Sequence, residues 1–200
     1  MSPTRNVGVL VGSLRRESYS RKIARALIAM APPTLSFSFV EIGELPLYNQ
    51  DLEGESAPKA WTEFRQRVRG IDALLFVTPE YNRGMPAAMK NAVDVGSRPP
   101  GQSVWNGKPA GVVSVTPGGL GAMASQQQLR QSLTAVGVAT MPLPEMYIAN
   151  VNTLLGEDGS VTNEKTREVL NKFLLALAVW IERFPAAVNV VAGAGAGVAR

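Results

Sequence analysis

The sequence of 200 residues contains no cysteine and no histidine. These absences exclude disulfides, thiol nucleophiles, iron–sulfur ligation, zinc sites of the usual ligand types and imidazole acid–base catalysis. Long apolar runs are also missing, since the longest, residues 173–181, is far too short to span a membrane. The N-terminus lacks the apolar core of a signal peptide, so we expect a cytoplasmic protein that does not bind membranes. Its chemistry must rest on carboxylates, hydroxyls, backbone dipoles or a bound cofactor.

Hydrophobic residues make up 46% of the chain and charged residues 18%, which is typical of a globular protein. The formal net charge of +4 mildly favours anionic partners. The basic residues are scattered, with one dense group between Arg15 and Arg25. Because no cluster of lysines and arginines alternates with aromatic residues, we expect no nucleic-acid binding.

Short apolar runs alternate along the chain with longer segments of helical periodicity. The expected strands are residues 7–11, 37–42, 73–77, 110–115 and a proline-interrupted strand within 140–148; the expected helices are residues 19–30, 57–69, 86–95, 123–136 and a last helix capped by Thr162 or Asn163. This alternation predicts an α/β fold with a doubly wound, five-stranded parallel sheet and helices on both faces. We expect one domain over residues 1–191, followed by a Gly/Ala-rich tail at 192–200 that is mobile or ordered only in an assembly.

In such sheets, ligands bind beyond the carboxyl ends of the strands, near the point where the strand order reverses. The loop after the first expected strand contains the hydroxyls of Ser13, Ser18 and Ser20 together with Arg15, just before a helix. Hydroxyls, an arginine and the free N–H groups of a helix N-terminus suit a phosphate. The alternative is a plain serine N-cap with solvated arginines, but three hydroxyls beside Arg15 favour phosphate. The glycine patterns of P-loops and dinucleotide sites are absent, which favours a phosphomonoester.

Two further loops carry unusual residues at the same expected edge. The loop after the third strand reads Pro79-Glu80-Tyr81-Asn82-Arg83-Gly84. Its consecutive backbone amides, its apolar Tyr81 ring and a glycine that permits close approach predict the wall of a binding site. The alternative is that Glu80 or Asn82 merely caps the helix that begins near Pro86. The loop after the fourth strand, Thr116-Pro117-Gly118-Gly119-Leu120-Gly121, offers further main-chain N–H groups.

Taken together, the three loops resemble those of the NADPH-dependent FMN reductase family, which includes bacterial quinone and chromate reductases and relatives of azoreductases. The matching residues are Gly12-Ser13-x-Arg15-x-x-Ser18-x-Ser20, then Thr78-Pro79-Glu80-Tyr81-Asn82 with Pro86, Lys90, Asn91 and Asp94, then Gly118-Gly119. The resemblance implies a flavodoxin-like fold, an FMN cofactor and no metal. By position, the cofactor-binding residues are Ser13, Arg15, Ser18, Tyr19 and Ser20 at the phosphate end, Pro79, Glu80, Tyr81 and Asn82 beside the isoalloxazine ring, and Thr116, Gly118 and Gly119 at its far edge.

The resemblance also implies the activity. NADPH or NADH would pass a hydride to N5 of FMN, and a small acceptor such as a quinone, chromate, an azo compound or free flavin would then take the electrons in a ping-pong cycle. No catalytic side chain is then required, in keeping with the missing histidine and cysteine. Arg83 or Arg98 is a candidate for attracting the phosphates of the nucleotide. Relatives usually assemble, so we expect a homodimer or homotetramer.

Two other functions stay open at this point. One is a flavodoxin-type electron carrier, which is a binding protein and not an enzyme. Such carriers are typically acidic, so the net charge of +4 counts against this interpretation. The other is an α/β domain that binds a phosphate ester through the Ser/Arg loop and has no redox activity.

Overall fold

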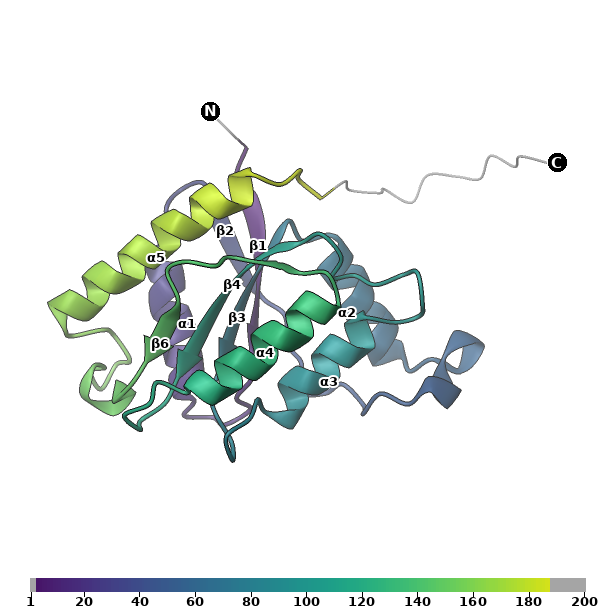
Figure 1. Ribbon diagram of the computed structural model, residues 1–200, viewed down its shortest axis with the longest axis horizontal. Helices are drawn as coiled ribbons and strands as arrows, with labels where there is room; N and C mark the ends of the chain where they lie inside the picture. The colour runs from purple at the N-terminus through teal and green to yellow at the C-terminus, as the bar shows by residue number, and fades with distance from the viewer. Residues whose placement is uncertain (1–2, 188–200) are drawn as a thin grey trace.

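The computed structural model describes residues 3–187, in which one parallel sheet lies between two layers of helices (Figure 1). The strands are β1 (Arg5–Val11), β2 (Leu35–Phe39), β3 (Ala73–Thr78), β4 (Pro109–Val115), β5 (Ala139–Thr140) and β6 (Met146–Ile148). They pair in the order β2-β1-β3-β4-β5, and β6 also pairs with β4, always in parallel. The order 2-1-3-4-5 is that of the flavodoxin-like fold, so the predicted fold class is confirmed.

Helices cover both faces of the sheet. They are α1 (Tyr19–Ala29), α2 (Lys59–Arg69), α3 (Ala87–Gly96), α4 (Met123–Ala135) and α5 (Glu164–Glu182). Residues of α1 and α5 pack against one face, and residues of α2, α3 and α4 pack against the other. On β3, Leu75 and Val77 point to the first core, while Leu74 and Phe76 point to the second. Every residue of β3 is therefore buried, which explains why its sequence is continuously apolar up to Thr78.

The helix starts differ in how they are capped. The side chain of Asn163 accepts a hydrogen bond from the N–H of Thr166 at 2.9 Å and caps α5. Asn163 is one of the two residues predicted as the cap of this helix. Pro86 precedes the first residue of α3, and no side chain among residues 3–187 caps this helix. The alternative in which Glu80 or Asn82 caps the helix near Pro86 is therefore wrong.

The fifth position of the sheet is occupied by two short strands. β5 pairs with the start of β4, at Pro109 and Ala110, and β6 pairs with its end, from Val113 to Val115. Pro142 and Pro144 lie between them, and proline cannot donate a hydrogen bond to a neighbouring strand. The predicted proline-interrupted strand thus exists as two pieces along the same neighbour.

The limits of the described residues leave two predictions untested. The domain boundary at 191 and the tail at 192–200 both lie outside residues 3–187. Within that range, no helix combines the length and the apolar character that crossing a membrane would require.

Candidate functional site

The loops that follow β1, β3 and β4 meet at the carboxyl edge of the sheet, the lower edge in Figure 1. The N–H of Gly12 donates to the carbonyl oxygen of Val77 at 2.9 Å, so the ends of β1 and β3 are bonded directly. A Cβ on Gly12 would lie 3.2 Å from Pro79 and 3.3 Å from both Pro86 and Thr78. Glycine thus lets the first loop approach the second closely, and a larger residue would require these neighbours to shift by a few tenths of an ångström. The structure brings the first two predicted loops together.

The loop after β1 holds many donors that have no partner in the described part of the chain. Ser13, Ser18 and Ser20 are each at least 95% buried. Ser18 is the N-cap of α1, and its Oγ accepts the N–H of Arg21 at 3.1 Å. Among residues 3–187, the hydroxyls of Ser13 and Ser20 make no hydrogen bond, and neither do the backbone N–H groups of residues 13–20.

This set of donors fits a phosphate. The Oγ atoms of Ser13 and Ser20 are not among the buried side-chain atoms without a partner in the described residues, so they are open to solvent or to a ligand that accepts hydrogen bonds. They lie at the N-terminus of α1, where the helix dipole favours negative charge. Arg15 is exposed beside them, whereas Tyr19 is half-buried and packs against the core. The serine hydroxyls and Arg15 are therefore suited to hold the phosphate of FMN.

Two other basic residues of this region, Arg21 and Lys22, are engaged with acids. The guanidinium of Arg21 donates to both carboxylate oxygens of Glu41, at 2.9 and 2.6 Å. These hydrogen bonds lower the pKa of Glu41 below its ordinary value and raise that of Arg21. Lys22 likewise pairs with Glu17 at 2.8 Å. The Arg21 and Lys22 charges are thus offset within the protein, whereas Arg15, Arg16 and Arg25 pair with no acid within residues 3–187. Arg15 stays the predicted phosphate ligand.

The loop after β3 forms a tight turn. Asn82 and Arg83 both have positive φ angles, of 50° and 62°. The N–H of Tyr81 donates to the oxygen of Gly84 at 3.0 Å, and the N–H of Gly84 donates back at 2.9 Å. This is the geometry of a type I′ turn, which usually carries glycine or asparagine in its centre. An arginine with positive φ is costly, and such strain concentrates at functional sites.

The turn uses some of its predicted donors and leaves others free. The Tyr81 N–H is consumed by the turn, so it is not available to a cofactor. The N–H groups of Glu80 and Asn82 have no partner within residues 3–187. Gly84 faces α4, because a Cβ there would lie 3.0 Å from Oε1 of Gln128. Gly84 therefore permits close approach of Gln128, and its approach to a ligand stays a prediction. The free donors are the amides on either side of Tyr81.

The side chain of Glu80 is also engaged. Its Oε2 accepts the N–H of Ser125, at the start of α4, at 3.2 Å. Its Oε1 accepts from the guanidinium of Arg83 at 3.2 Å. Glu80 therefore contributes its backbone to the candidate site, while its carboxylate links the turn to α4.

The glycine-rich loop after β4 is partly tied down by its own residues. Oγ1 of Thr116 accepts the N–H of Gly118 at 3.1 Å. The oxygen of Gly118 accepts the N–H of Asn150 at 3.2 Å. Gly119 is exposed, no described atom lies within 4 Å of a Cβ built on it, and its N–H has no partner in the described residues. Of the three predicted site residues Thr116, Gly118 and Gly119, only Gly119 has a backbone N–H without a partner within residues 3–187.

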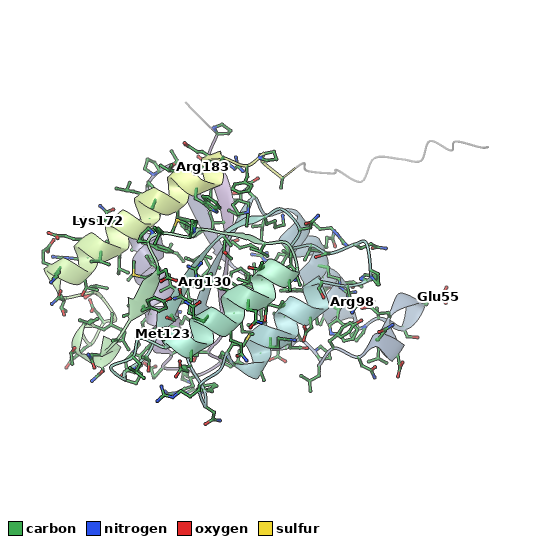
Figure 2. The ribbon with its side chains drawn as sticks, in the orientation of Figure 1. Glu55, Arg98, Met123, Arg130, Lys172 and Arg183 are labelled. Carbon is green, nitrogen blue, oxygen red and sulfur yellow. The ribbon has the colours of Figure 1, made fainter. Side chains whose placement is uncertain are left out.

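The two arginines considered for the nucleotide lie at different ends of the molecule. Arg83 is exposed on the turn after β3. Arg98 follows the C-terminus of α3 and lines a hollow with Ser97, Asn106 and Gly137. Figure 2 shows Arg98 well away from Met123, which marks the start of α4 at the candidate site. Arg98 therefore lies away from the start of α4, and the attraction of the nucleotide by either arginine stays a prediction.

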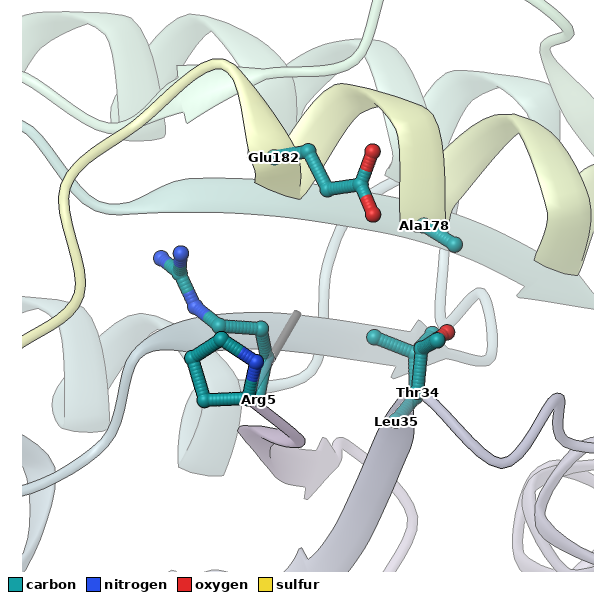
Figure 3. Close-up of a pocket in the computed structure, with 6 residues that line it drawn as sticks. Arg5, Thr34, Leu35, Ala178 and Glu182 are labelled. Carbon is teal, nitrogen blue, oxygen red and sulfur yellow. The ribbon is translucent and has the colours of Figure 1, made fainter. Parts of the chain in front are cut away.

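A second cavity lies at the opposite, amino edge of the sheet (Figure 3). Its lining comprises Pro3, Arg5, Thr34, Leu35, Ala178 and Glu182. The guanidinium of Arg5 donates to the carbonyl oxygens of Phe184, at 3.2 Å, and Pro185, at 3.0 Å. Arg5 thus holds the chain that leaves α5. This cavity belongs to the scaffold and is separate from the three loops.

One part of the site was not predicted from the sequence. Ser125 and Gln128 of α4 bond to the turn after β3, and neither stands in a recognisable motif. The one signal in the sequence was the run of glutamines at residues 126–128, which is unusual in a helix that packs on a sheet.

The chain is similar to known oxidoreductases along most of its length. The family model described as NADPH-dependent FMN reductase matches residues 5–153. A quinone reductase of Pseudomonas putida is 50% identical over 182 residues, which cover 91% of this chain and 97% of the relative. A 2-hydroxy-1,4-benzoquinone reductase of a Burkholderia species is 42% identical over 175 residues, which cover 88% and 95% of the two chains. Among solved structures, FerB from Paracoccus denitrificans, a flavoenzyme NAD(P)H:(acceptor) oxidoreductase, matches with a TM-score of 0.85 and 42% identity over 90% of this chain and 99% of FerB.

These matches confirm the resemblance that the three loops suggested, together with the predicted oxidoreductase class, the FMN cofactor and the dependence on NAD(P)H. The assignment of individual side chains to the cofactor stays a prediction. Because the family model spans residues 5–153 and relatives of high identity match along almost their whole length, the chain belongs to the NADPH-dependent FMN reductase family.

Proposed function

We propose that this protein is an NAD(P)H-dependent quinone reductase whose FMN lies across the loops after β1, β3 and β4. The observation that carries the proposal is the set of free donors at this edge. The N–H groups of residues 13–20 stand beside the hydroxyls of Ser13 and Ser20, and the N–H groups of Glu80, Asn82 and Gly119 have no partner among residues 3–187. Such an array suits a molecule with a phosphate at one end and a polar ring at the other.

The residues present divide into two groups by what they would hold. The hydroxyls of Ser13, Ser18 and Ser20, the surrounding amides and Arg15 would bind the phosphate. The amides of Glu80, Asn82 and Gly119 would donate to the polar edge of the ring, with Pro79, Tyr81 and Thr116 beside it. When bound, FMN would supply the hydride and electron-transfer chemistry, so these residues would supply orientation and electrostatics.

The side chains in these loops are arranged for binding and not for proton transfer. Glu80 is the only carboxylate of the turn, and both of its oxygens are hydrogen-bonded, one to Ser125 and one to Arg83. Glu17, in the loop after β1, pairs with Lys22. With no histidine or cysteine in the chain, solvent water would supply the proton that completes reduction of the acceptor.

A flat apolar acceptor suits the surface around the loops. Leu14, Tyr81, Leu120 and Met123 are exposed large apolar side chains, and each comes from one of the three loops or from the start of α4. Two relatives are named for quinones, and a quinone ring matches such a surface better than a charged acceptor such as chromate.

The assembly and the location are also proposals. Exposed apolar residues at the edge of the site support contact with a second copy of the chain, as expected for a homodimer or homotetramer. Light scattering on the purified protein would measure the assembly size. The cytoplasm, where NAD(P)H is continuously regenerated, stays our expectation for the location.

The decisive experiment is an absorption spectrum of the protein after incubation with FMN and gel filtration, followed by identification of the released flavin. We expect a yellow protein that carries FMN and oxidises NADPH steadily with a simple benzoquinone and no partner protein. A protein that stays colourless would instead favour a domain that binds a phosphate ester without redox activity. A yellow protein without steady NADPH oxidation would favour the electron carrier.

A further inference from the structure

Two residues of α4 hold the two ends of the turn after β3. Oγ of Ser125 donates to the carbonyl oxygen of Pro79 at 2.7 Å and lies 3.1 Å from Oγ1 of Thr78. Oε1 of Gln128 accepts the N–H of Met85 at 2.7 Å. Ser125 and Gln128 are three residues apart, so they lie on the same face of α4. That face therefore brackets residues 79–85.

The turn after β3 also stabilises the start of α4. The N-cap position of α4 is Ala122, which has a left-handed φ of 58° and provides no capping side chain. The carboxylate of Glu80 takes this place by accepting the N–H of Ser125 in the first turn. A negative charge there also complements the positive end of the helix dipole. The turn and the helix thus stabilise each other.

Hydrogen bonds fix the turn to α4 more than to any other described element. Within residues 3–187, every hydrogen bond that reaches residues 79–85 from another helix or strand comes from α4, apart from that of the adjacent Thr78 hydroxyl to the oxygen of Pro79. The centre of the turn, from Tyr81 to Arg83, is exposed. The direction of the free N–H groups of Glu80 and Asn82 therefore depends on where α4 places the two ends of the turn.

We propose that Ser125 and Gln128 are positioning residues for the flavin ring. They would act through the turn and not by touching the cofactor, because they set the orientation of the Glu80 and Asn82 amides. This inference rests on the proposed function, since it assigns these amides to the ring. It predicts that loss of either residue weakens recognition of the ring and leaves recognition of the phosphate unchanged.

Gln126, on the same helix, provides a control that distinguishes positioning of the ring from a purely structural role. Gln126 is fully buried, and its Nε2 donates to Oγ of Ser114 at 3.0 Å and to the oxygen of Met146 at 2.8 Å. It holds β4 and β6 together, and none of its side-chain hydrogen bonds within residues 3–187 reaches the turn after β3. Gln126→Ala should therefore lower the stability of the protein without changing how the ring is bound. Gln128 is exposed. Gln128→Ala should therefore change how the ring is bound and leave the stability of the protein unchanged.

The test compares dissociation constants for FMN and for riboflavin, which lacks the phosphate, by fluorescence titration of the apoprotein. Gln128→Ala and Ser125→Ala should raise Kd for both flavins by the same factor, about three- to tenfold, the scale of one lost hydrogen bond. They should also shift the visible absorption bands of the bound flavin. Gln128→Glu keeps an acceptor for the Met85 N–H and should restore the wild-type Kd for both flavins. The side chain of Gln127 bonds to Glu145 and Tyr147 and not to the turn. Gln127→Ala should therefore bind both flavins as the wild type does.

The outcomes are distinct. Wild-type Kd values and spectra in both Gln128→Ala and Ser125→Ala would overturn the inference alone. An increase in Kd for FMN but not for riboflavin would also overturn it, because the effect would then lie at the phosphate. If the wild-type protein binds neither flavin, the proposed function fails, and the inference fails with it.

Discussion

The N–H of Gly12 and the carbonyl oxygen of Val77 are joined by a hydrogen bond of 2.9 Å. This bond extends the pairing of β1 and β3 by one step beyond the end of β1. It fixes the start of the loop that carries Ser13 against the start of the loop that carries Glu80. The spacing between the predicted phosphate end and the predicted ring end of the site is therefore set by the sheet and not by flexible loops.

Replacing Gly12 should disturb this junction. The branched side chain of valine in Gly12→Val would meet Pro79, Pro86 and Thr78, all within 3.3 Å of the new Cβ. Because the neighbours include two rigid proline rings, we expect a loss of about 1–3 kcal/mol in the free energy of unfolding, which urea denaturation would measure. FMN binding should weaken as well, because the two loops would separate.

A second glycine provides the control. Gly119 lies in the loop after β4, and a Cβ placed on it would have no described atom within 4 Å. Gly119→Ala should leave the free energy of unfolding within about 0.5 kcal/mol of the wild type. Equal losses in the two variants would contradict the idea that Gly12 is needed for close approach.

Arg15→Ala should weaken FMN but not riboflavin. The lost hydrogen bond to a charged group is worth about 1.5–3 kcal/mol, which a fluorescence titration of FMN would detect as a higher Kd. Arg25→Ala removes an equal charge from an exposed position on α1 and serves as the control for general electrostatics. If Arg15→Ala and Arg25→Ala changed Kd equally, the phosphate would lie elsewhere.

Much of the fold could be predicted because it depends on periodic patterns. The continuous apolar run of β3 indicated a strand buried on both faces, and the alternation of strands with helices indicated the layers and the parallel sheet. The edges were harder to predict. The second strand lies at residues 35–39, earlier than the expected 37–42. The fifth strand is split at Pro142 and Pro144. Both differences arise because pairing at an edge depends on neighbours that the local pattern does not encode.

The candidate site was predictable to a different extent. The loops were recognised because parallel strands bring their carboxyl ends to one edge, so residues distant in sequence could be placed together. Which amides remain free was not predictable, since the Tyr81 and Gly118 N–H groups are consumed by local turns. The contribution of Ser125 and Gln128 was also hidden, because hydrogen bonds between separate elements leave no spacing pattern.

A buried ion pair supports the segment between β2 and α2. Arg65 of α2 is 4% exposed, and its guanidinium contacts Glu53 at 2.6 Å and the oxygen of Val95 at 2.8 Å. Glu53→Ala would leave a buried positive charge without its partner, so we expect a loss of about 3 kcal/mol in the free energy of unfolding. Glu63, whose pair with Lys59 is largely exposed, is the matched control, and Glu63→Ala should cost less than about 0.5 kcal/mol. Similar losses in the two variants would show that burial of the pair is unimportant.

The pair of Arg21 and Glu41 should give stability that depends on pH. The hydrogen bonds from Arg21 lower the pKa of Glu41 in the folded protein below its ordinary value of 4.5. The folded state therefore binds fewer protons at this site than the unfolded state, so the contribution is fully present above pH 4.5 and is lost as the pH falls through the lowered pKa. Thermal denaturation should show a higher Tm for the wild type than for Glu41→Gln at about pH 7, with the gap closing at acidic pH. Because Glu41 is exposed, added salt should also narrow the gap at neutral pH. A gap that stayed constant from neutral to strongly acidic pH would show that the ion pair does not contribute in this way.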